Sequence, residues 1–136
     1  MPQADTASIR WEDAGEKDTL SIVIPARDEE GCLVETVTEL VTALKTADIT
    51  HEILVVDDGS TDSTLDLLAE LHLNLPTVKY ISNTPPHGFG LAVRKGLQNF
   101  RGDAVAIMMA DGSDDPQDLI KYYRKLCEGY DCVFGS

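Results

Sequence analysis

The sequence predicts an α/β fold in which a mostly parallel sheet carries helices on both faces. From Thr19 onward, short apolar runs alternate with segments of helical periodicity, which is the pattern of parallel strands joined by crossover helices. Several runs are apolar at successive positions, as expected for strands covered on both faces. A chain of 136 residues with 43% hydrophobic content is long enough for one domain with a substantial core. We therefore expect one domain over residues 19–136, preceded by a polar flexible arm over residues 1–18 that lacks the apolar stretch of a signal peptide.

Apolar runs and helical periodicity locate the expected elements. The runs predicted to be strands cover residues 20–25, 52–58, 78–82, 103–110 and 131–135. Apolar residues spaced three and four apart predict helices over 33–44 and 119–127, and a further helix is expected to begin near Ser60. Asp115 before Pro116 predicts a capped helix start, and Gly102 and Gly129 fit helix C-terminal caps. The chain ends after the last predicted strand without a helix to cover it, so we expect the domain to be truncated at its C-terminus.

The charge balance is strongly acidic, with 24 Asp and Glu against 11 Lys and Arg and a formal net charge of −13. Such a balance argues against binding of nucleic acid or of anionic membrane surfaces through broad electrostatics. An anionic ligand would need a local basic group or a bridging cation. The three cysteines, Cys32, Cys127 and Cys132, lack C-x-x-C spacing and suit buried free thiols in a reducing compartment. We therefore expect a cytoplasmic location.

Polar and acidic residues follow three of the predicted strands. Residues 25–30 read PARDEE, residues 57–62 read DDGSTD and residues 111–115 read DGSDD. In open α/β sheets ligands bind at the carboxyl ends of the strands, so these segments are expected to meet at one edge and form the site. Side chains alternate along a strand, so Asp57 and Asp58 are predicted to point in different directions. Either they cap the turn and the following helix, or one of them accepts a hydrogen bond from a base N–H.

The third of these segments belongs to an acidic cluster between residues 110 and 118, where four carboxylates lie near a glycine: Asp111, Asp114, Asp115 and Asp118. So many carboxylates repel one another unless a cation or a helix cap relieves them. Hard oxygen ligands at a strand end suit Mg²⁺ or Mn²⁺, which substrate phosphates usually complete. Asp115 and Asp118 fit helix capping and compensation of the helix dipole. Asp111, at the strand end itself, is the better candidate ligand.

The loop over residues 82–90 contains a Gly-x-Gly and leads into a predicted helix. The glycines either bring the helix N-terminus close to a phosphate or simply turn the chain. Arg94 and Lys95 either face a diphosphate or form a solvated helix face. His87 is interpreted as a loop residue, because no carboxylate partner can be assigned to it from the sequence.

Taken in order, the segments SIVIPARDEE, EILVVDDGSTDST, GFGLAVRKGL and MMADGSDDPQDL resemble family 2 of the GT-A-fold glycosyltransferases, and most closely the dolichyl- or polyprenyl-phosphate sugar transferases. The resemblance implies a Rossmann-like nucleotide-diphospho-sugar transferase fold. It implies transfer of a sugar, with inversion, from a UDP- or GDP-linked donor to an acceptor such as a polyprenyl or dolichyl phosphate. It also implies a divalent cation, Mg²⁺ or Mn²⁺, on the diphosphate. A lipid-phosphate acceptor would place a longer protein at the cytoplasmic face of a membrane.

The resemblance assigns the nucleoside end of the donor to two strand ends. Pro25, Arg27 and Glu29 match positions that line the nucleoside pocket, and Arg27 stands where the family often has Tyr. Val56 and Asp58 match the pair on the second strand, with Asp58 contacting the base.

The resemblance assigns the diphosphate end to the third acidic segment. Met109, Ala110 and Asp111 match the family's D-x-D element, with Met109 in place of the first Asp. Ser113 matches a position near the metal that often holds Gln, and Asp114 is expected to compensate for Met109 from the loop. The expected metal ligands are therefore Asp111, Ser113 and Asp114. No catalytic base is assigned, because in relatives it lies beyond the point where this chain ends.

Three other functions compete with this interpretation. The run ILVVDD also resembles the start of a phosphoacceptor receiver domain, but here a complete strand and helix precede the acidic pair. A nucleotidyltransferase that makes nucleotide sugars would want a glycine-rich basic loop where this chain has ARDEE. The third alternative is a nucleotide-sugar-binding fragment or module without turnover.

Overall fold

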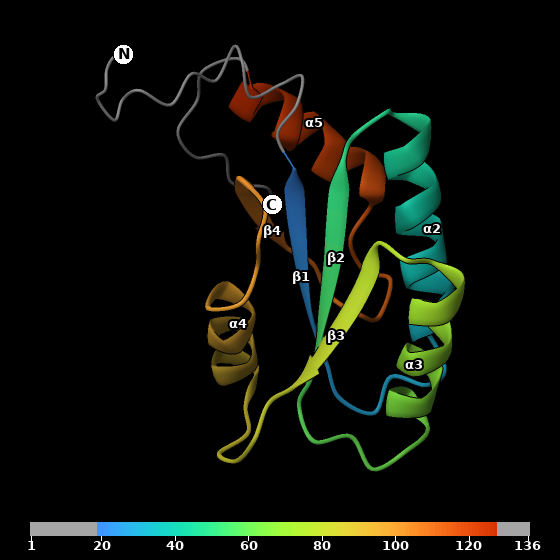
Figure 1. Cartoon of the computed structure of the whole chain (residues 1–136), viewed down its shortest axis with the longest axis vertical. Helices are drawn as coiled ribbons and strands as arrows, with labels where there is room; N and C mark the ends of the chain where they lie inside the picture. The colour runs from blue at the N-terminus through green and yellow to red at the C-terminus, as the bar shows by residue number, and fades with distance from the viewer. Residues whose placement is uncertain (1–18, 128–136) are drawn as a thin grey trace.

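The computed structural model describes residues 19–127, which form strands and helices in alternation (Figure 1). The strands are β1 (Leu20–Ala26), β2 (His51–Asp57), β3 (Val78–Ser82) and β4 (Ala104–Ile107). The helices are α2 (Leu33–Thr46), α3 (Thr64–Asn74), α4 (Phe89–Leu97) and α5 (Pro116–Cys127). None of the helices within the described residues is long and apolar enough to cross a membrane.

The described strands form one parallel sheet in the order β3-β2-β1-β4, which confirms the predicted sheet. In the centre, Ile22 of β1 pairs with Ile53 of β2 on one side and with Ala106 of β4 on the other. The chain passes from β1 through β2 to β3 and then crosses back to β4 on the far side of β1. The strand order therefore reverses between β1 and β4, and open sheets bind ligands at such a switch point.

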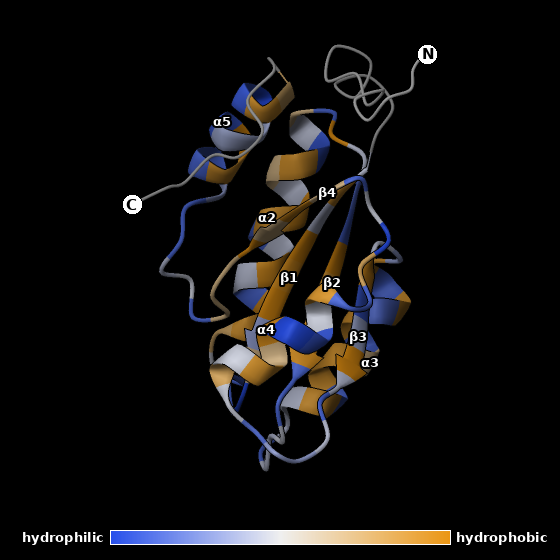
Figure 2. Ribbon diagram, turned by 90° about the vertical axis from the view of Figure 1, so that its left-hand side faces the viewer, coloured by the Kyte–Doolittle hydropathy of each residue, from blue (hydrophilic) through white to orange (hydrophobic). Residues whose placement is uncertain are grey.

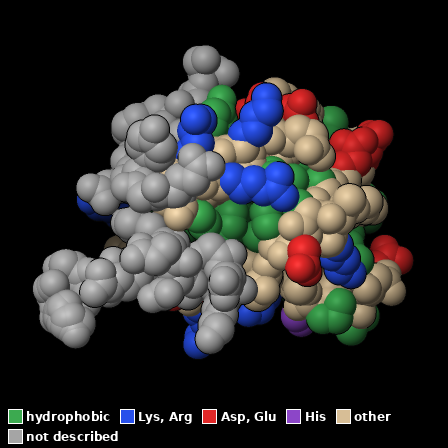
Figure 3. Space-filling view, turned by 90° about the horizontal axis from the view of Figure 1, so that it is seen from above, with side chains coloured by type: hydrophobic (Ala, Val, Ile, Leu, Met, Phe, Trp, Pro, Cys, Tyr) green, Lys and Arg blue, Asp and Glu red, His purple; other side chains and the backbone are tan. Residues whose placement is uncertain are grey.

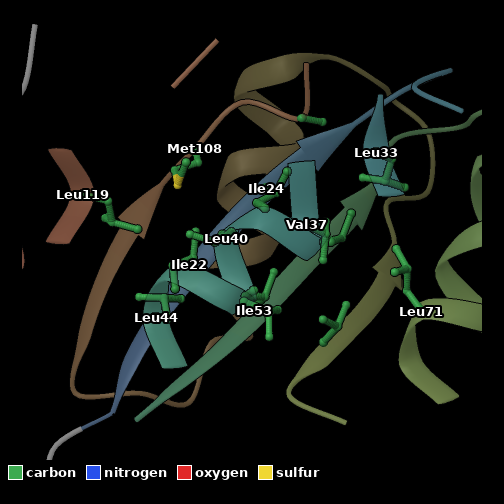
Figure 4. Close-up of a cluster of buried hydrophobic side chains, with 14 of the residues drawn as sticks. Ile22, Ile24, Leu33, Val37, Leu40, Leu44, Ile53, Leu71, Met108 and Leu119 are labelled. Atoms are coloured by element: carbon green, nitrogen blue, oxygen red, sulfur yellow. The ribbon is translucent and has the colours of Figure 1, made fainter. Parts of the chain in front are cut away.

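Helices cover both faces of the sheet, as predicted, with α2, α3 and α5 on one face and α4 on the other (Figure 1). The larger core packs the fully buried Ile22, Ile24 and Ile53 against the apolar side of α2 (Figure 4). The smaller core packs Val23 and Val56 against α4. Successive residues of β1 thus enter opposite cores, which explains why the middle of β1 is apolar at successive positions, as its orange colour in Figure 2 shows.

The predicted start is confirmed for α5 and wrong for α3. The N–H of Gln117 donates to Oδ1 of Asp115 at 2.9 Å, so the predicted cap of α5 is confirmed. By contrast, α3 begins at Thr64 rather than near Ser60. Residues 60–63 instead form a loop whose polar groups bond to the loop that follows β1.

Three expectations are wrong: one about strand length, one about the burial of cysteines and one about a helix cap. β4 ends at Ile107 rather than at residue 110, because the chain leaves β1 after the hydrogen bond from Met108 N–H to the Val23 carbonyl. Cys32 is exposed, since it stands at the N-terminus of α2 outside the core, and Cys127 is partly buried. Gly102 does not cap a helix, because α4 ends at Leu97; it is needed where the chain passes β1, since a Cβ there would lie 2.6 Å from the Thr19 carbonyl oxygen. The predicted arm 1–18, strand 131–135, Gly129 cap and Cys132 lie outside the described residues.

A buried carboxylate ties the sheet together at the end where the strands begin. Glu52, on β2, is 4% exposed and accepts hydrogen bonds from Ser21 Oγ, from the backbone N–H of Arg101 and from Lys79 Nζ. Ser21 Oγ accepts in turn from the N–H of Gly102 at 2.8 Å. Figure 3 looks onto this end of the molecule, where Lys and Arg side chains lie among apolar ones. The network joins three strands to the segment between α4 and β4.

Gly96 allows α4 to approach the sheet, and we expect Gly96→Ala to destabilise the fold. A Cβ at Gly96 would lie 2.3 Å from Cγ1 of Val23, a fully buried and stiff side chain. Overpacking of this kind costs about 1 to 3 kcal/mol of unfolding free energy, measurable by urea titration.

The matched control lies in the same helix. Gly90 has no atom within 4 Å of an added Cβ, so Gly90→Ala should leave stability unchanged or raise it by up to about 1 kcal/mol. Equal stability of the two variants would contradict the close packing of α4 on β1.

Candidate functional site

Four loops follow the carboxyl ends of the strands, and those after β1, β2 and β3 lie at the lower end of the molecule in Figure 1. They follow β1, β2, β3 and β4 and cover residues 27–32, 58–63, 83–88 and 108–115. The three acidic segments that the sequence singled out therefore reach the same edge of the sheet, at and beside its switch point.

The loops after β1 and β2 are locked together by side-chain to backbone hydrogen bonds. Asp28 Oδ1 accepts from the N–H groups of Thr61 and Asp62, at 2.7 and 3.3 Å. Glu30 Oε1 accepts from the N–H of Ser63 at 2.8 Å. Asp28 also adopts a positive φ of 53°, which this short polar side chain tolerates. The carboxylates of Asp28 and Glu30 are thus used to hold the loops in place.

Glu29 lies between these two residues in the chain and is partly buried. Its N–H donates to Thr64 Oγ1 at 2.9 Å, which anchors its backbone to the start of α3. Burial raises the pKa of the Glu29 carboxyl, and the negative charges of Asp111, Asp62 and Asp28 raise it further. The acidic segment after β4 passes close to the first turn of α2, since a Cβ added at Gly112 would lie 3.4 Å from Thr36 Oγ1. The segments predicted for the nucleoside and for the diphosphate therefore follow neighbouring strands, β1 and β4.

Asp57 and Asp58 point to opposite faces of the sheet, as predicted. Asp58 turns toward α4, where Oδ1 accepts from Asn83 Nδ2 at 2.8 Å and from His87 Nδ1 at 2.9 Å. Its Oδ2 accepts from the N–H of Gly88, the N-cap residue of α4, at 2.9 Å. Burial raises the pKa of the Asp58 carboxyl, but these hydrogen bonds outweigh burial and hold it below its ordinary value. The N-terminus of α4, considered above as a phosphate site, is thus occupied by a carboxylate of the protein itself.

Asp57 has a contrasting environment. The residue is 4% exposed, and its Oδ1 has no hydrogen-bond partner among the described residues. A buried carboxylate oxygen without a partner costs free energy. Asp57 therefore does not cap the turn that follows β2, and the capping interpretation is wrong for this residue.

The acidic loop after β4 combines exposed carboxylates with local turns. Asp111 is exposed, and its Oδ1 accepts from the N–H of Ser113 at 2.9 Å. Hydrogen bonding from Ser113 holds the pKa of the Asp111 carboxyl below its ordinary value, so Asp111 is ionised at neutral pH. Asp114 Oδ2 accepts from the N–H of Met109 at 2.8 Å, which brings Asp114 back to the D-x-D position.

The acidic loop after β4 offers only part of a cation site. Within residues 19–127 no group of three or more His, Cys, Asp or Glu side chains is arranged to hold a metal ion. A magnesium or manganese ion that retains waters and binds substrate phosphates needs one or two protein carboxylates. Asp111, with Asp114 and Ser113 in the same loop, fits that limited role and does not form a closed cage.

The remaining predicted residues differ in what they offer to a ligand. Arg27 and Met109 are exposed, the latter by 38%, and stand at the two sides of the switch point. Pro25 is buried, and Val56 and Ala110 are 0% and 1% exposed. These three form the floor beneath the loops and present almost no surface of their own. Their assigned contacts with the donor nucleotide stay predictions.

The basic pair of α4, Arg94 and Lys95, lies away from the carboxyl edge of the sheet. Arg94 and Lys95 lie in the last turn of α4, and Arg94 is exposed. Because α4 starts at the site and runs away from it, their position favours a solvated helix face over contact with a diphosphate.

Two residues of the site were missed from the sequence. His87 has the carboxylate partner that could not be assigned, and Asn83 binds the same carboxylate. Both lie at least 25 residues from Asp58, so no local spacing reveals the contact. The sequence held one signal of this contact, the glycine at position 59. The structure explains it, because the positive φ of 79° and the contact with the His87 ring require a residue without a side chain.

The parallel sheet, its switch point and the acidic loops at its carboxyl edge define an α/β protein with the GT-A fold. Residues 21–136 match the family model of Glycosyl transferase family 2, so the chain belongs to that family. It is similar to the uncharacterized glycosyltransferase YkcC of Bacillus subtilis, with 32% identity over 84% of this chain and 35% of that protein. It is also similar to the uncharacterized glycosyltransferase sll0501 of Synechocystis, with 34% identity over 86% of this chain and 37% of that protein.

The fold is shared with solved structures of the same type. The crystal structure of mannosyl-3-phosphoglycerate synthase from Rubrobacter xylanophilus is similar with a TM-score of 0.73 and 25% identity, over 87% of this chain and 39% of that one. The chain spans little more than a third of the length of the curated relatives named above, 35% and 37%. The family membership also sets aside the receiver and nucleotidyltransferase alternatives.

Proposed function

We propose that this chain binds a UDP- or GDP-linked sugar and belongs to an enzyme that transfers the sugar to an acceptor. The observation that carries the proposal is the position of the acidic loops after β1 and β4, which follow two neighbouring strands at the switch point of the sheet. Open α/β sheets bind nucleotides at this place, and the family membership supports a sugar nucleotide as the ligand.

The donor is proposed to lie across the four loops. Its nucleoside end would lie near Arg27, Glu29 and the loop that Asp58 holds, above the floor of Pro25 and Val56. Its diphosphate would lie near Met109, Ala110 and Asp111. Mg²⁺ or Mn²⁺ held by Asp111, with Ser113 and Asp114 in support, would stabilise the negative charge of the departing diphosphate. The ionised Asp111 is ready for this role without loss of a proton.

We also propose that the acceptor is a lipid phosphate. A polyprenyl or dolichyl phosphate is already ionised and needs no base to attack the anomeric carbon. Attack opposite to the departing diphosphate would invert the configuration at that carbon. We place such a reaction at the cytoplasmic face of a membrane. Full-length protein with GDP- or UDP-sugars and a short-chain polyprenyl phosphate would yield a lipid-linked sugar; transfer to soluble hydroxyl acceptors alone would contradict this acceptor class.

A binding module without turnover is the second candidate, and the D-x-D position favours it. Met109 offers no carboxylate there, and Asp114 bonds to the Met109 backbone with one of its oxygens. Comparing sugar transfer and donor hydrolysis by this chain and by a longer form separates the two candidates. Donor binding by both forms with turnover by neither would establish the binding module.

The cation site leads to a test with a matched control. We expect Asp111→Ala to weaken Mn²⁺-dependent binding of UDP or GDP at least about tenfold, because it removes the carboxylate nearest the switch point. Asp118→Ala removes an exposed carboxylate from the first turn of α5 and should leave binding unchanged. Isothermal titration with and without Mn²⁺ measures both. Unchanged binding in Asp111→Ala and in Asp114→Ala would rule out the metal site.

A further inference from the structure

Arg27 is the only Lys or Arg in the four loops at the carboxyl edge of the sheet. The loops after β1, β2 and β4 carry three, two and three carboxylates, and the loop after β3 carries none. Arg27 is exposed, and its side chain forms no hydrogen bond or ion pair with another residue of the range 19–127. The edge therefore holds one guanidinium that is available to a ligand.

The carboxylates beside Arg27 do not pair with it because backbone N–H groups already satisfy them. Asp28 Oδ1 accepts from the N–H of Thr61 at 2.7 Å, and Glu30 Oε1 accepts from the N–H of Ser63 at 2.8 Å. A guanidinium is always charged and has five N–H donors but no acceptor. Its free donors therefore match an anionic ligand at this edge.

The alternation of side chains along the strands puts Arg27 on the face of the sheet that α4 covers. Val23 of β1 packs in the smaller core against α4, and Arg27, four residues further on, follows on the same side. Met108 and Ala110 belong to the larger core on the opposite face, so Met109 between them also lies on the α4 side. Arg27 and Met109 thus share one face of the sheet.

That face is open beside β4. The alanines of β4 pack against the larger core, whereas Val105 and Ile107 point to the α4 side and are 37% and 45% exposed. Val23 pairs with Ile107, after which the chain leaves β1 and opens the switch point between Arg27 and Met109. Neighbouring strands lie about 4.8 Å apart, a distance that a long arginine side chain spans.

The opposite side of the switch point carries less negative charge than the D-x-D element of the family. Met109 has no carboxylate, and Asp114 Oδ2 accepts from the N–H of Met109. With fewer carboxylates, a divalent cation is held less firmly at this position. A diphosphate bound to a chain of net charge −13 then needs a further positive group close by. A guanidinium meets this need, because it binds phosphate oxygens through two parallel N–H···O bonds.

We infer that Arg27 binds the diphosphate of the donor directly and supplies positive charge that a cation held without the first D-x-D carboxylate supplies less firmly. The inference rests on the proposed function and deepens it. The backbone of Arg27 stays at the nucleoside end of the donor, while its guanidinium extends across the switch point toward Met109. Part of the affinity for the donor is therefore independent of Mg²⁺ and Mn²⁺.

Binding in the absence of metal tests the inference. Isothermal titration of UDP and GDP in EDTA should show binding by Arg27→Met at least about tenfold weaker than by the wild type, because the variant keeps the length of the side chain without its charge. Arg27→Lys keeps the charge without the paired donors and should lie between the two. Arg94→Met, which removes an exposed charge from the last turn of α4, should bind like the wild type.

Two further measurements separate contact with the phosphates from contact with the base. Uridine and guanosine carry no phosphate and should bind the wild type and Arg27→Met alike. Raising the NaCl concentration should weaken metal-free binding of UDP and GDP by the wild type more than by Arg27→Met, because salt screens the contact between the guanidinium and the phosphates.

The opposing results are distinct. Unchanged binding of UDP and GDP by Arg27→Met in EDTA, or an equal loss for nucleosides and nucleoside diphosphates, would overturn the inference and leave the proposed function standing. Binding by the wild type only in the presence of Mn²⁺ would do the same. A wild type that binds neither UDP nor GDP with or without Mn²⁺ would contradict the proposed function and the inference together. Circular dichroism of each variant verifies that folded proteins are compared.

Discussion

Replacing Glu52 by Ala is expected to lower the free energy of unfolding by about 3 kcal/mol. The substitution leaves Ser21 Oγ, the Arg101 N–H and Lys79 Nζ without their common acceptor at the amino end of the sheet. Urea unfolding measures the loss. Glu70→Ala, which removes an exposed carboxylate from α3, should change stability by less than about 0.5 kcal/mol.

The same carboxylate should make stability depend on pH. Burial raises the pKa of the Glu52 carboxyl, but hydrogen bonds from Ser21, Arg101 and Lys79 outweigh burial and lower it overall. A lowered pKa in the folded state means that the contribution is complete above the ordinary carboxyl pKa and is lost as pH falls through the folded value. The stability gap between wild type and Glu52→Gln should therefore narrow from pH 7 to about pH 3. A gap that widens toward acid pH would contradict this assignment.

Replacing Asp58 by Asn is expected to cost about 2 kcal/mol and to weaken nucleotide binding at least tenfold. In the Asn variant an NH2 group replaces one of the two carboxylate oxygens that accept hydrogen bonds. This NH2 group cannot accept, so the contacts with Asn83, His87 and Gly88 cannot all form. The loop after β3 would then lose its anchor.

The neighbouring residue provides the control. Asp57→Asn has the same change in shape and charge, but Asp57 Oδ1 has no hydrogen-bond partner among residues 19–127. Removing a buried, unpartnered charge should leave stability unchanged or raise it. Thermal unfolding and nucleotide titration of both variants test the pair. Equal losses in the two would contradict the separate roles of these adjacent carboxylates.

The overall fold followed from local patterns in the sequence. Continuous apolar strands such as Ile22 to Ile24 require cover on both faces, and helical stripes supply that cover, so a parallel sheet could be predicted before any contact was known. The end of β4 could not be predicted in this way. Met108 and Ala110 are as apolar and as buried as residues of a strand, but they lie beyond the last residue of β4. Their sequence therefore does not distinguish them from strand residues.

The location of the site was also predicted, because acidic loops that follow parallel strands must meet at one edge. The use of each carboxylate could not be predicted. Asp28, Glu29 and Glu30 are consecutive and similar, yet the carboxylates of Asp28 and Glu30 hold the neighbouring loop, whereas Glu29 is anchored through its backbone N–H. Side-chain direction at a loop depends on backbone angles such as the positive φ of Asp28, which no periodicity reveals.

By itself the sequence determined the α/β class, the edge of the sheet where ligands bind and the family resemblance, because these depend on periodicity and on the order of motifs. Only the tertiary structure decided that Asp58 is enclosed by Asn83, His87 and Gly88, and that Asp57 is left without a partner. The physical reason is that hydrogen bonds between loops distant in sequence depend on how α4 packs against the sheet. That packing brings His87, interpreted from the sequence as a loop residue without a carboxylate partner, against Gly59 and within hydrogen-bonding distance of Asp58.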